Sequence, residues 1–79
     1  MNRKYDTLKL IAMLVKRVVE TSYSGELSGS AIAALIDVST GKGAQLKKLL
    51  EVEKLLNADG SLNVEEARKW LSKKLGSSG

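Results

Sequence analysis

The chain has no cysteine, no histidine, no proline and no phenylalanine. Without cysteine it has no disulfide, and no thiolate that could bind a metal or attack a substrate. Without histidine it lacks the commonest general base and the commonest metal ligand. Serine, tyrosine, lysine and carboxylate side chains remain, but no pair of them stands out as a nucleophile with its base. We therefore expect no enzyme, no cofactor, no metal site and no small-molecule substrate.

Long apolar runs are also missing. The longest one, Leu10 to Val15, is far shorter than the roughly twenty residues of a membrane-spanning helix. The run is preceded by Lys9 and closed by Lys16, and no small-residue cleavage site of a secretory signal follows it. We expect a cytoplasmic protein that has no membrane partner.

The charged residues give a mild basic excess. Thirteen Lys and Arg stand against nine Asp and Glu, which makes a net charge of +4 over 79 residues. A chain of this length forms one domain at most, which we place at residues 1–75, with a flexible tail at 76–79. Residues 39–56 hold four basic side chains, whereas 25–38 hold none. Small basic domains often bind nucleic acid, so the charge favours such a partner slightly.

Hydrophobic periodicity predicts four helical segments and therefore a small all-α domain. The segments lie at about residues 7–22, 31–37, 40–56 and 64–75. A side chain that can accept hydrogen bonds from the first helical turn precedes each of them. These N-caps are Asp6, then Ser28 or Ser30, then Ser39, and finally Asn63, where Glu66 would complete a capping box.

The first segment has an apolar arc that is wider than one contact face needs. One stripe at helical spacing consists of Leu8, Ile11, Ala12, Val15, Val18 and Val19. Leu10 and Leu14 form a second stripe beside it, and Met13 lies further round. Either this is a central helix that packs on two sides, or Leu10, Met13 and Leu14 form the seam of a homodimer.

The residues from Ile32 to Leu50 resemble a helix-turn-helix. Two helices that cross steeply need a small residue at their contact, apolar residues between them and a cap on the second helix. Ala33 would be the small contact, Val38 the apolar residue of the turn and Ser39 the cap. The apolar residues between the helices would be Ile32, Ile36, Leu46 and Leu49.

Two positions depart from this pattern. Asp37 stands where the turn usually has glycine, although aspartate adopts the left-handed conformation more readily than most residues. Gly43 stands where the second helix usually has a branched apolar residue, which predicts a thinner core between the two helices.

The likeness to DNA-binding domains extends over about residues 31–72. The segment from Val38 to Leu50 resembles the recognition helix of winged helix-turn-helix regulators, and a minimal β-hairpin wing at residues 55–63 is a further option. The segment from Leu62 to Leu71 is similar to the closing helix of phage small-terminase and excisionase-type domains. This resemblance implies a protein that binds duplex DNA, working as a dimer or beside partners.

A helical wheel gives an independent indication. With Leu46, Leu49 and Leu50 turned inward, the outward residues are Thr40, Gly41, Ala44, Gln45, Lys47 and Lys48. Glutamine reads adenine through paired hydrogen bonds, and lysine reaches guanine or phosphate. Glycines let the helix N-terminus approach a phosphate closely. The predicted DNA-binding residues are Thr40, Lys42, Gln45, Lys47 and Lys48.

The competing interpretation is that these lysines belong to an ordinary solvated face. The chain would then be a structural or protein-interaction helical bundle, natural or designed, that oligomerises through its first helix. Salt-dependent binding to duplex DNA separates the two hypotheses.

Overall fold

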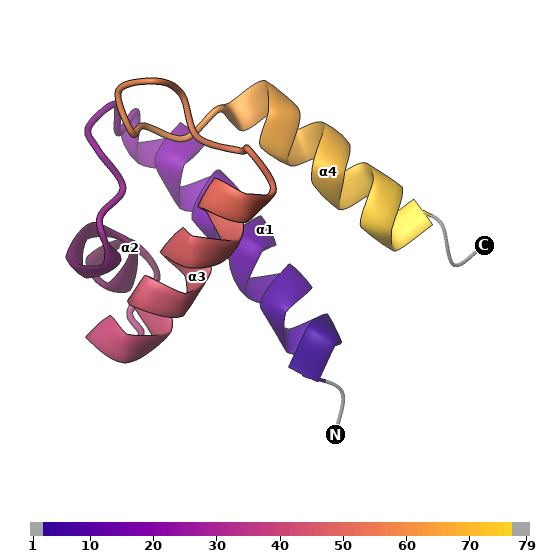
Figure 1. Cartoon of the computed structure of the whole chain (residues 1–79), viewed down its shortest axis with the longest axis horizontal. Helices are drawn as coiled ribbons and strands as arrows, with labels where there is room; N and C mark the ends of the chain where they lie inside the picture. The colour runs from indigo at the N-terminus through magenta and orange to yellow at the C-terminus, as the bar shows by residue number, and fades with distance from the viewer. Residues whose placement is uncertain (1–2, 77–79) are drawn as a thin grey trace.

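A computed structural model describes the backbone of residues 3–76 and the side chains of residues 7–76. Over this range the chain forms four helices, which are α1 (Arg3–Thr21), α2 (Gly29–Ile36), α3 (Thr40–Val52) and α4 (Val64–Gly76). Figure 1 shows α1 running behind α3, with α2 on the left and α4 on the upper right. α2 packs against α3, and α1 packs against both α2 and α4. The prediction of a small all-α domain with four helices is confirmed.

The core lies where the helices meet α1. Its largest fully buried side chains come from α1, the following loop, α2 and α3, and they are Ile11, Leu14, Leu27, Ile32 and Leu50. Burying one such side chain contributes roughly 1.5–3 kcal/mol, so this cluster holds the helices together. No helix within residues 3–76 combines the length and the apolar composition needed to cross a membrane.

α1 packs on two sides, as one of the two sequence interpretations predicted. Leu14 is 0 % exposed, so it belongs to the core of this chain and does not lie on an exposed seam. Leu10 is half-buried and packs against the same core. Of the three residues predicted for a dimer seam, Met13 is the one that is exposed, at 41 %.

The two ends of the chain differ from the sequence prediction. α1 begins at Arg3, so Asp6 lies within the helix and is not its N-cap. The apolar pattern of the sequence indicates where α1 begins to contact the core, near Leu8. It does not indicate where the helical hydrogen bonds of α1 begin. Gly76, predicted as the first residue of the tail, is the last residue of α4, and 77–79 lie outside the described residues.

α3 ends at Val52, four residues before the predicted end at Leu56. Nine further residues rotate a helix by about 180°, so a continued α3 would point Leu55 away from the side on which Leu46 is buried. Lys54 instead adopts a left-handed conformation with φ 59°. The N–H of Leu55 then donates to the carbonyl of Leu50 at 2.9 Å, and Leu55 is buried at 3 % exposed. The need to bury Leu55 therefore terminates the helix.

A minimal hairpin connects α3 to α4. It consists of a single antiparallel bridge between Leu56 and Leu62. Its turn is closed by the N–H of Asn57, which donates to the carbonyl of Ser61 at 2.7 Å, and by Gly60 at φ 88°. The Asp59 carboxylate accepts from the backbone N–H and the hydroxyl of Ser61 at 3.0 and 2.6 Å. These hydrogen bonds, with that of the hydroxyl the strongest, hold the pKa of Asp59 below its ordinary value.

α4 starts at the predicted cap but without the full capping box. The side chain of Asn63 accepts from the N–H of Glu66 at 3.1 Å, which confirms the N-cap. The N–H of Asn63 donates to the carbonyl of Leu55 at 2.8 Å, while the carboxylate of Glu66 lies 3.7 Å from the ammonium of Lys69. The hairpin thus supplies the acceptor that the glutamate of a capping box would provide.

Candidate nucleic-acid interface

α2 and α3 are two capped helices joined by a short turn, in the segment for which the sequence predicted a helix-turn-helix. The side chains of Ser28 and Ser39 cap the two helices, accepting from the N–H groups of Ala31 and Lys42 at 3.2 Å each. Asp37 ends α2 with φ 57° and ψ 55°. This is the left-handed conformation that glycine usually supplies in such a turn. The two caps and the conformational tolerance of Asp37 agree with the sequence prediction.

Gly43 sets how closely the two helices approach. It is buried, and a Cβ atom added there would overlap the carbonyl oxygen of Gly29 and lie 3.2 Å from the backbone nitrogen of Ala33. On the opposite side, a Cβ on Gly29 would lie 3.2 Å from the Cα of Ala44. The backbones of α2 and α3 therefore touch at this crossing. Gly43 allows direct backbone contact in place of the thinner side-chain core that the sequence predicted.

Arg17 of α1 fixes the far end of α2. Its Nε donates to the backbone carbonyl of Leu35 at 3.0 Å, and its guanidinium lies 3.7 Å from the carboxylate of Glu20. A cation at the C-terminus of a helix also interacts favourably with the helix dipole. Sequence reasoning missed this contact because the two residues are far apart in the chain and belong to different helices.

The side of α3 that points away from α1 and α2 is made of short or flexible side chains. We call it the α3 outer face, and its exposed residues are Thr40, Gly41, Ala44, Gln45, Lys48, Glu51 and Val52. A Cβ added to Gly41 would meet no atom within 4 Å, so the backbone is open to an approaching ligand at this point. Three of the five residues predicted to bind DNA, Thr40, Gln45 and Lys48, lie on this face.

The other two predicted residues lie beside the α3 outer face. Lys42 is partly buried, at the start of the helix. Lys47 is also partly buried, and its ammonium lies 3.4 Å from the carboxylate of Glu51 on the same helix. Among the described residues, neither Lys42 nor Lys48 takes part in an ion pair. Lys42 and Lys48 are therefore the lysines of α3 whose charge no neighbouring carboxylate offsets in the described residues.

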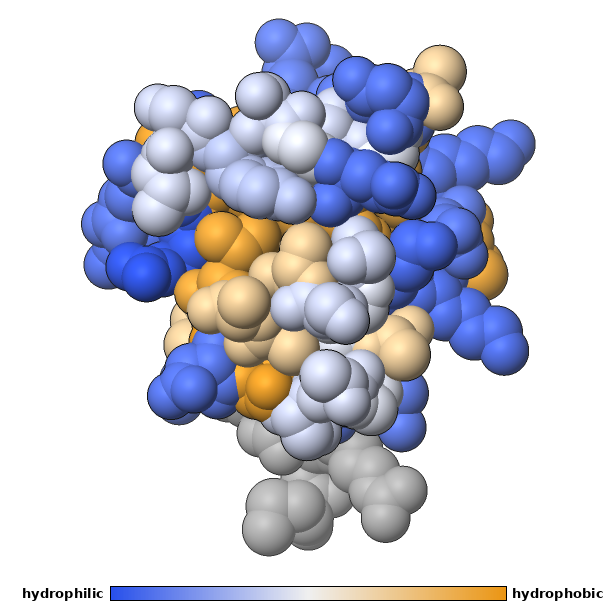
Figure 2. All heavy atoms as spheres, turned by 90° about the vertical axis from the view of Figure 1, so that its left-hand side faces the viewer, coloured by the Kyte–Doolittle hydropathy of each residue, from blue (hydrophilic) through white to orange (hydrophobic). Residues whose placement is uncertain are grey.

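α2 contributes no charge to this surface. Its eight residues include no acidic or basic side chain. Figure 2 faces the side on which α2 lies and shows apolar groups across the middle, with hydrophilic groups above and beside them. The apolar side chains of this segment that reach the surface are Ala31, Ala34, Leu35 and Val38. Of the two helices α2 and α3, α3 is therefore the one that has basic side chains.

The hairpin differs in charge from a DNA-binding wing. Residues 55–63 contain no lysine or arginine. Their one ionisable side chain, Asp59, has a lowered pKa and is an anion at neutral pH. The N–H of Leu27 donates to the carbonyl of Gly60 at 2.9 Å, which joins the hairpin to the loop between α1 and α2, and Glu26 lies against Gly60. Its hydrogen bonds and its negative charge are those of a segment that connects α3 to α4.

No protein family, characterised protein or solved structure matches this chain. The candidate interface therefore stands on the local geometry of α2, the turn and α3, and on the composition of the α3 outer face.

Proposed function

We propose that this chain is a small non-enzymatic protein that binds duplex DNA through the α3 outer face. The observation that carries the proposal is the glycine-tight crossing of α2 and α3. This close crossing supports the assignment of α3 as the second helix of a helix-turn-helix, which is the helix that enters the major groove in such motifs.

The residues of the α3 outer face have the chemistry of base and phosphate recognition. Gln45 has the donor and acceptor that pair with an adenine edge, and Lys48 reaches a guanine edge or a phosphate. Gly41 and Ala44 add little bulk, so the helix can approach the floor of a groove. Of the two exposed charged side chains of this face, Lys48 takes part in no ion pair among the described residues, whereas Glu51 lies 3.4 Å from the ammonium of Lys47.

The small number of cations sets the expected strength and salt dependence. If Lys42 and Lys48 each neutralise one phosphate, log affinity falls by about 1.8 for a tenfold rise in salt. That corresponds to about twelvefold weaker binding between 50 and 200 mM salt. One copy would read few bases, so high specificity requires a second copy or a second protein on adjacent DNA.

A fluorescence-anisotropy titration with labelled duplexes of random and genomic sequence at these two salt concentrations tests the proposal. We expect Gln45→Ala and Lys48→Ala to weaken binding, with Lys48→Ala also reducing the salt slope by about one phosphate. Arg68→Ala is the matched control, because Arg68 is exposed on α4 and lies outside the helix-turn-helix. The proposal fails if no duplex binds at low salt, or if the Arg68 variant loses as much affinity as the Lys48 variant.

A further inference from the structure

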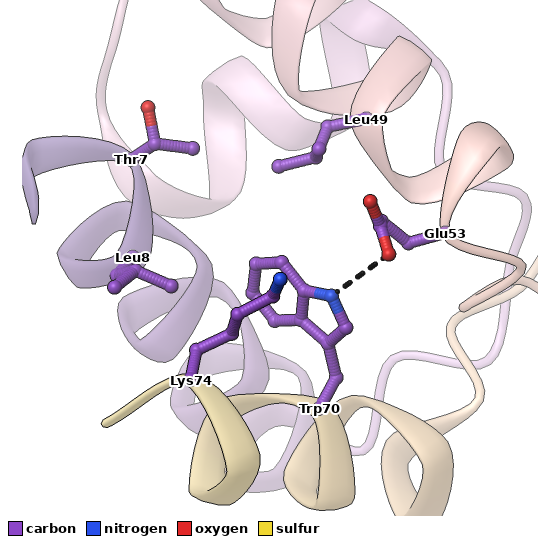
Figure 3. A pocket seen from close by; sticks show the side chains of 6 residues that line it. All are labelled: Thr7, Leu8, Leu49, Glu53, Trp70 and Lys74. Carbon is purple, nitrogen blue, oxygen red and sulfur yellow. Dashed lines mark hydrogen bonds between the residues drawn. The ribbon is translucent and has the colours of Figure 1, made fainter. Parts of the chain in front are cut away.

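A second surface feature lies between α1, α3 and α4, outside the helix-turn-helix. It is a pocket of ≈ 200 Å³, which we call the Trp70 groove (Figure 3). α1 and α4 contribute two lining residues each, and α3 contributes one together with its C-cap; they are Thr7, Leu8, Leu49, Glu53, Trp70 and Lys74. The floor is apolar, because the indole ring lies between the leucine side chains of α1 and α3.

The orientation of Trp70 is fixed by contacts on two sides. Its Nε1–H donates to Oε1 of Glu53 at 3.0 Å, which ties α4 to the C-terminal end of α3. The ammonium of Lys74 lies 5.7 Å from the ring centroid, within the range of a cation–π contact. The ring is thus held in place as a preformed wall with one side open to solvent.

Apolar side chains continue beyond both ends of the groove. At one end Leu8 also borders a hollow with Ala12 and Leu75, which is 50 % exposed. At the other end Leu49 borders a shallow hollow with Val52, which is 69 % exposed. Exposed apolar groups that form a continuous surface commonly mark an interaction site.

The charges around this apolar surface are mostly positive. On its rim, the charged side chains that border the groove and its two extensions are Lys9, Lys48, Lys74 and Glu53, and a neighbouring hollow that shares Trp70 and Glu53 adds Lys69, Lys73 and Glu66. Both carboxylates are engaged, since Glu53 accepts from the indole and Glu66 lies 3.7 Å from the ammonium of Lys69. The rim therefore has a net positive charge that an acidic partner would complement.

From this combination we infer that the Trp70 groove docks an acidic amphipathic helix of a partner protein. At ≈ 200 Å³ the pocket is smaller than small-molecule sites of about 300–1,000 Å³, and it suits one or two anchoring side chains. A second copy of this chain, with its net charge of +4, would bring like charges together. Trp70 and Lys73 lie outside the α3 outer face, so variants at these two positions test the groove separately from DNA binding, although Lys48 borders both surfaces.

The probe is a synthetic helical peptide of about 18 residues, five helical turns, with leucines along one face and glutamates elsewhere. A matched peptide carries lysines in place of the glutamates. The chain has one tryptophan, so its fluorescence reports directly on the groove. We expect saturable binding of the acidic peptide below about 1 mM and no binding of the lysine peptide, with amide shifts of the ¹⁵N-labelled protein confined to the groove.

Two surface variants keep the test independent of folding. Reversing one rim charge with Lys73→Glu should weaken binding of the acidic peptide about fivefold. Arg68→Glu is the control, because Arg68 precedes Trp70 by two residues and lies about 160° from it around α4. Equal binding of both peptides, no binding of either, or equal effects of the two variants would overturn the inference. Duplex DNA binding that Lys73→Glu abolishes, or a dimer that Trp70→Ala disperses, would assign the groove to a different occupant.

Discussion

Two of the contacts between helices in this domain are built in opposite ways. Between α2 and α3 the contact positions are glycines. Because Gly29 and Gly43 have no side chain, the two backbones touch directly. Between α3 and α4 a large side chain is inserted, and Trp70 spans the gap through its hydrogen bond to Glu53. The first contact has no free space, whereas the second leaves a pocket open. The α2–α3 crossing therefore permits only one close arrangement of the two helices, whereas the Trp70 groove has room for an additional side chain.

The largest effect is expected at the glycine crossing. Gly43→Ala should lower the free energy of unfolding by about 2–3 kcal/mol, because the added methyl overlaps the backbone of α2. The same substitution at Gly41 meets open space, and it should raise stability by about 0.5–1 kcal/mol through helix propensity. Urea unfolding followed by circular dichroism measures both variants. Equal shifts at the two positions would refute the tight crossing.

Shortening the Trp70 side chain should lower the free energy of unfolding by less than Gly43→Ala does. Trp70→Ala removes a partly buried ring beside a pocket that already exists, so we expect a loss of about 1–2 kcal/mol, below the 3–5 kcal/mol of a fully buried tryptophan. Trp70→Phe retains most of the ring contact and loses the hydrogen bond to Glu53, so its loss should be smaller still. Chemical unfolding of both variants checks this, and a loss near 4 kcal/mol for Trp70→Ala would place the ring in the core.

Arg17 tests whether the crossing also depends on α1. Arg17→Met keeps the aliphatic stem but removes the hydrogen bond to the carbonyl of Leu35, for an expected loss of about 0.5–1 kcal/mol. Glu20→Gln removes only the exposed ion pair with the same guanidinium and should change stability by less than about 0.5 kcal/mol. Thermal melting of the two variants separates the contributions. If Glu20→Gln is the more damaging, the ion pair and not the carbonyl contact is the important one.

The smallest effect is expected at the hairpin, from the lowered pKa of Asp59. Because the folded state holds this pKa below its unfolded value, ionised Asp59 stabilises the fold above that unfolded value. The contribution is lost as the pH falls below about 4 and through the lower folded pKa. Asp59→Asn should therefore be less stable than the wild type at pH 7, with the difference shrinking toward pH 3. A difference that stays constant over this range would contradict the assignment.

Local signals in the sequence predicted most of the fold. Ser28, Ser39 and Asn63 cap helices within three residues of themselves, so their neighbours along the chain are sufficient to identify them. The left-handed conformation of Asp37 is likewise a property of one residue in one turn. The outward direction of Gln45 and Lys48 follows from helical spacing once Leu46 and Leu50 are taken as buried.

The contacts that sequence reasoning missed join residues far apart in the chain. Position 43 must be glycine because a larger side chain would overlap the backbone of Gly29 on another helix. α3 ends early because Leu55 is buried against residues distant in the chain. The hydrogen bond between Trp70 and Glu53 has the same character. Periodicity reports which side of a helix is apolar, but it does not tell which other helix covers that side.

The hydrogen bond between Leu27 and Gly60 has a consequence for the order in which the chain assembles. It joins the two ends of the segment that contains α2 and α3, and so closes a long loop of the backbone. Bringing distant ends together has an entropic cost, which falls once the two helices have folded against each other and shortened the span. We therefore expect α2 and α3 to pair early, and the hairpin with α4 to close onto them late and to open first.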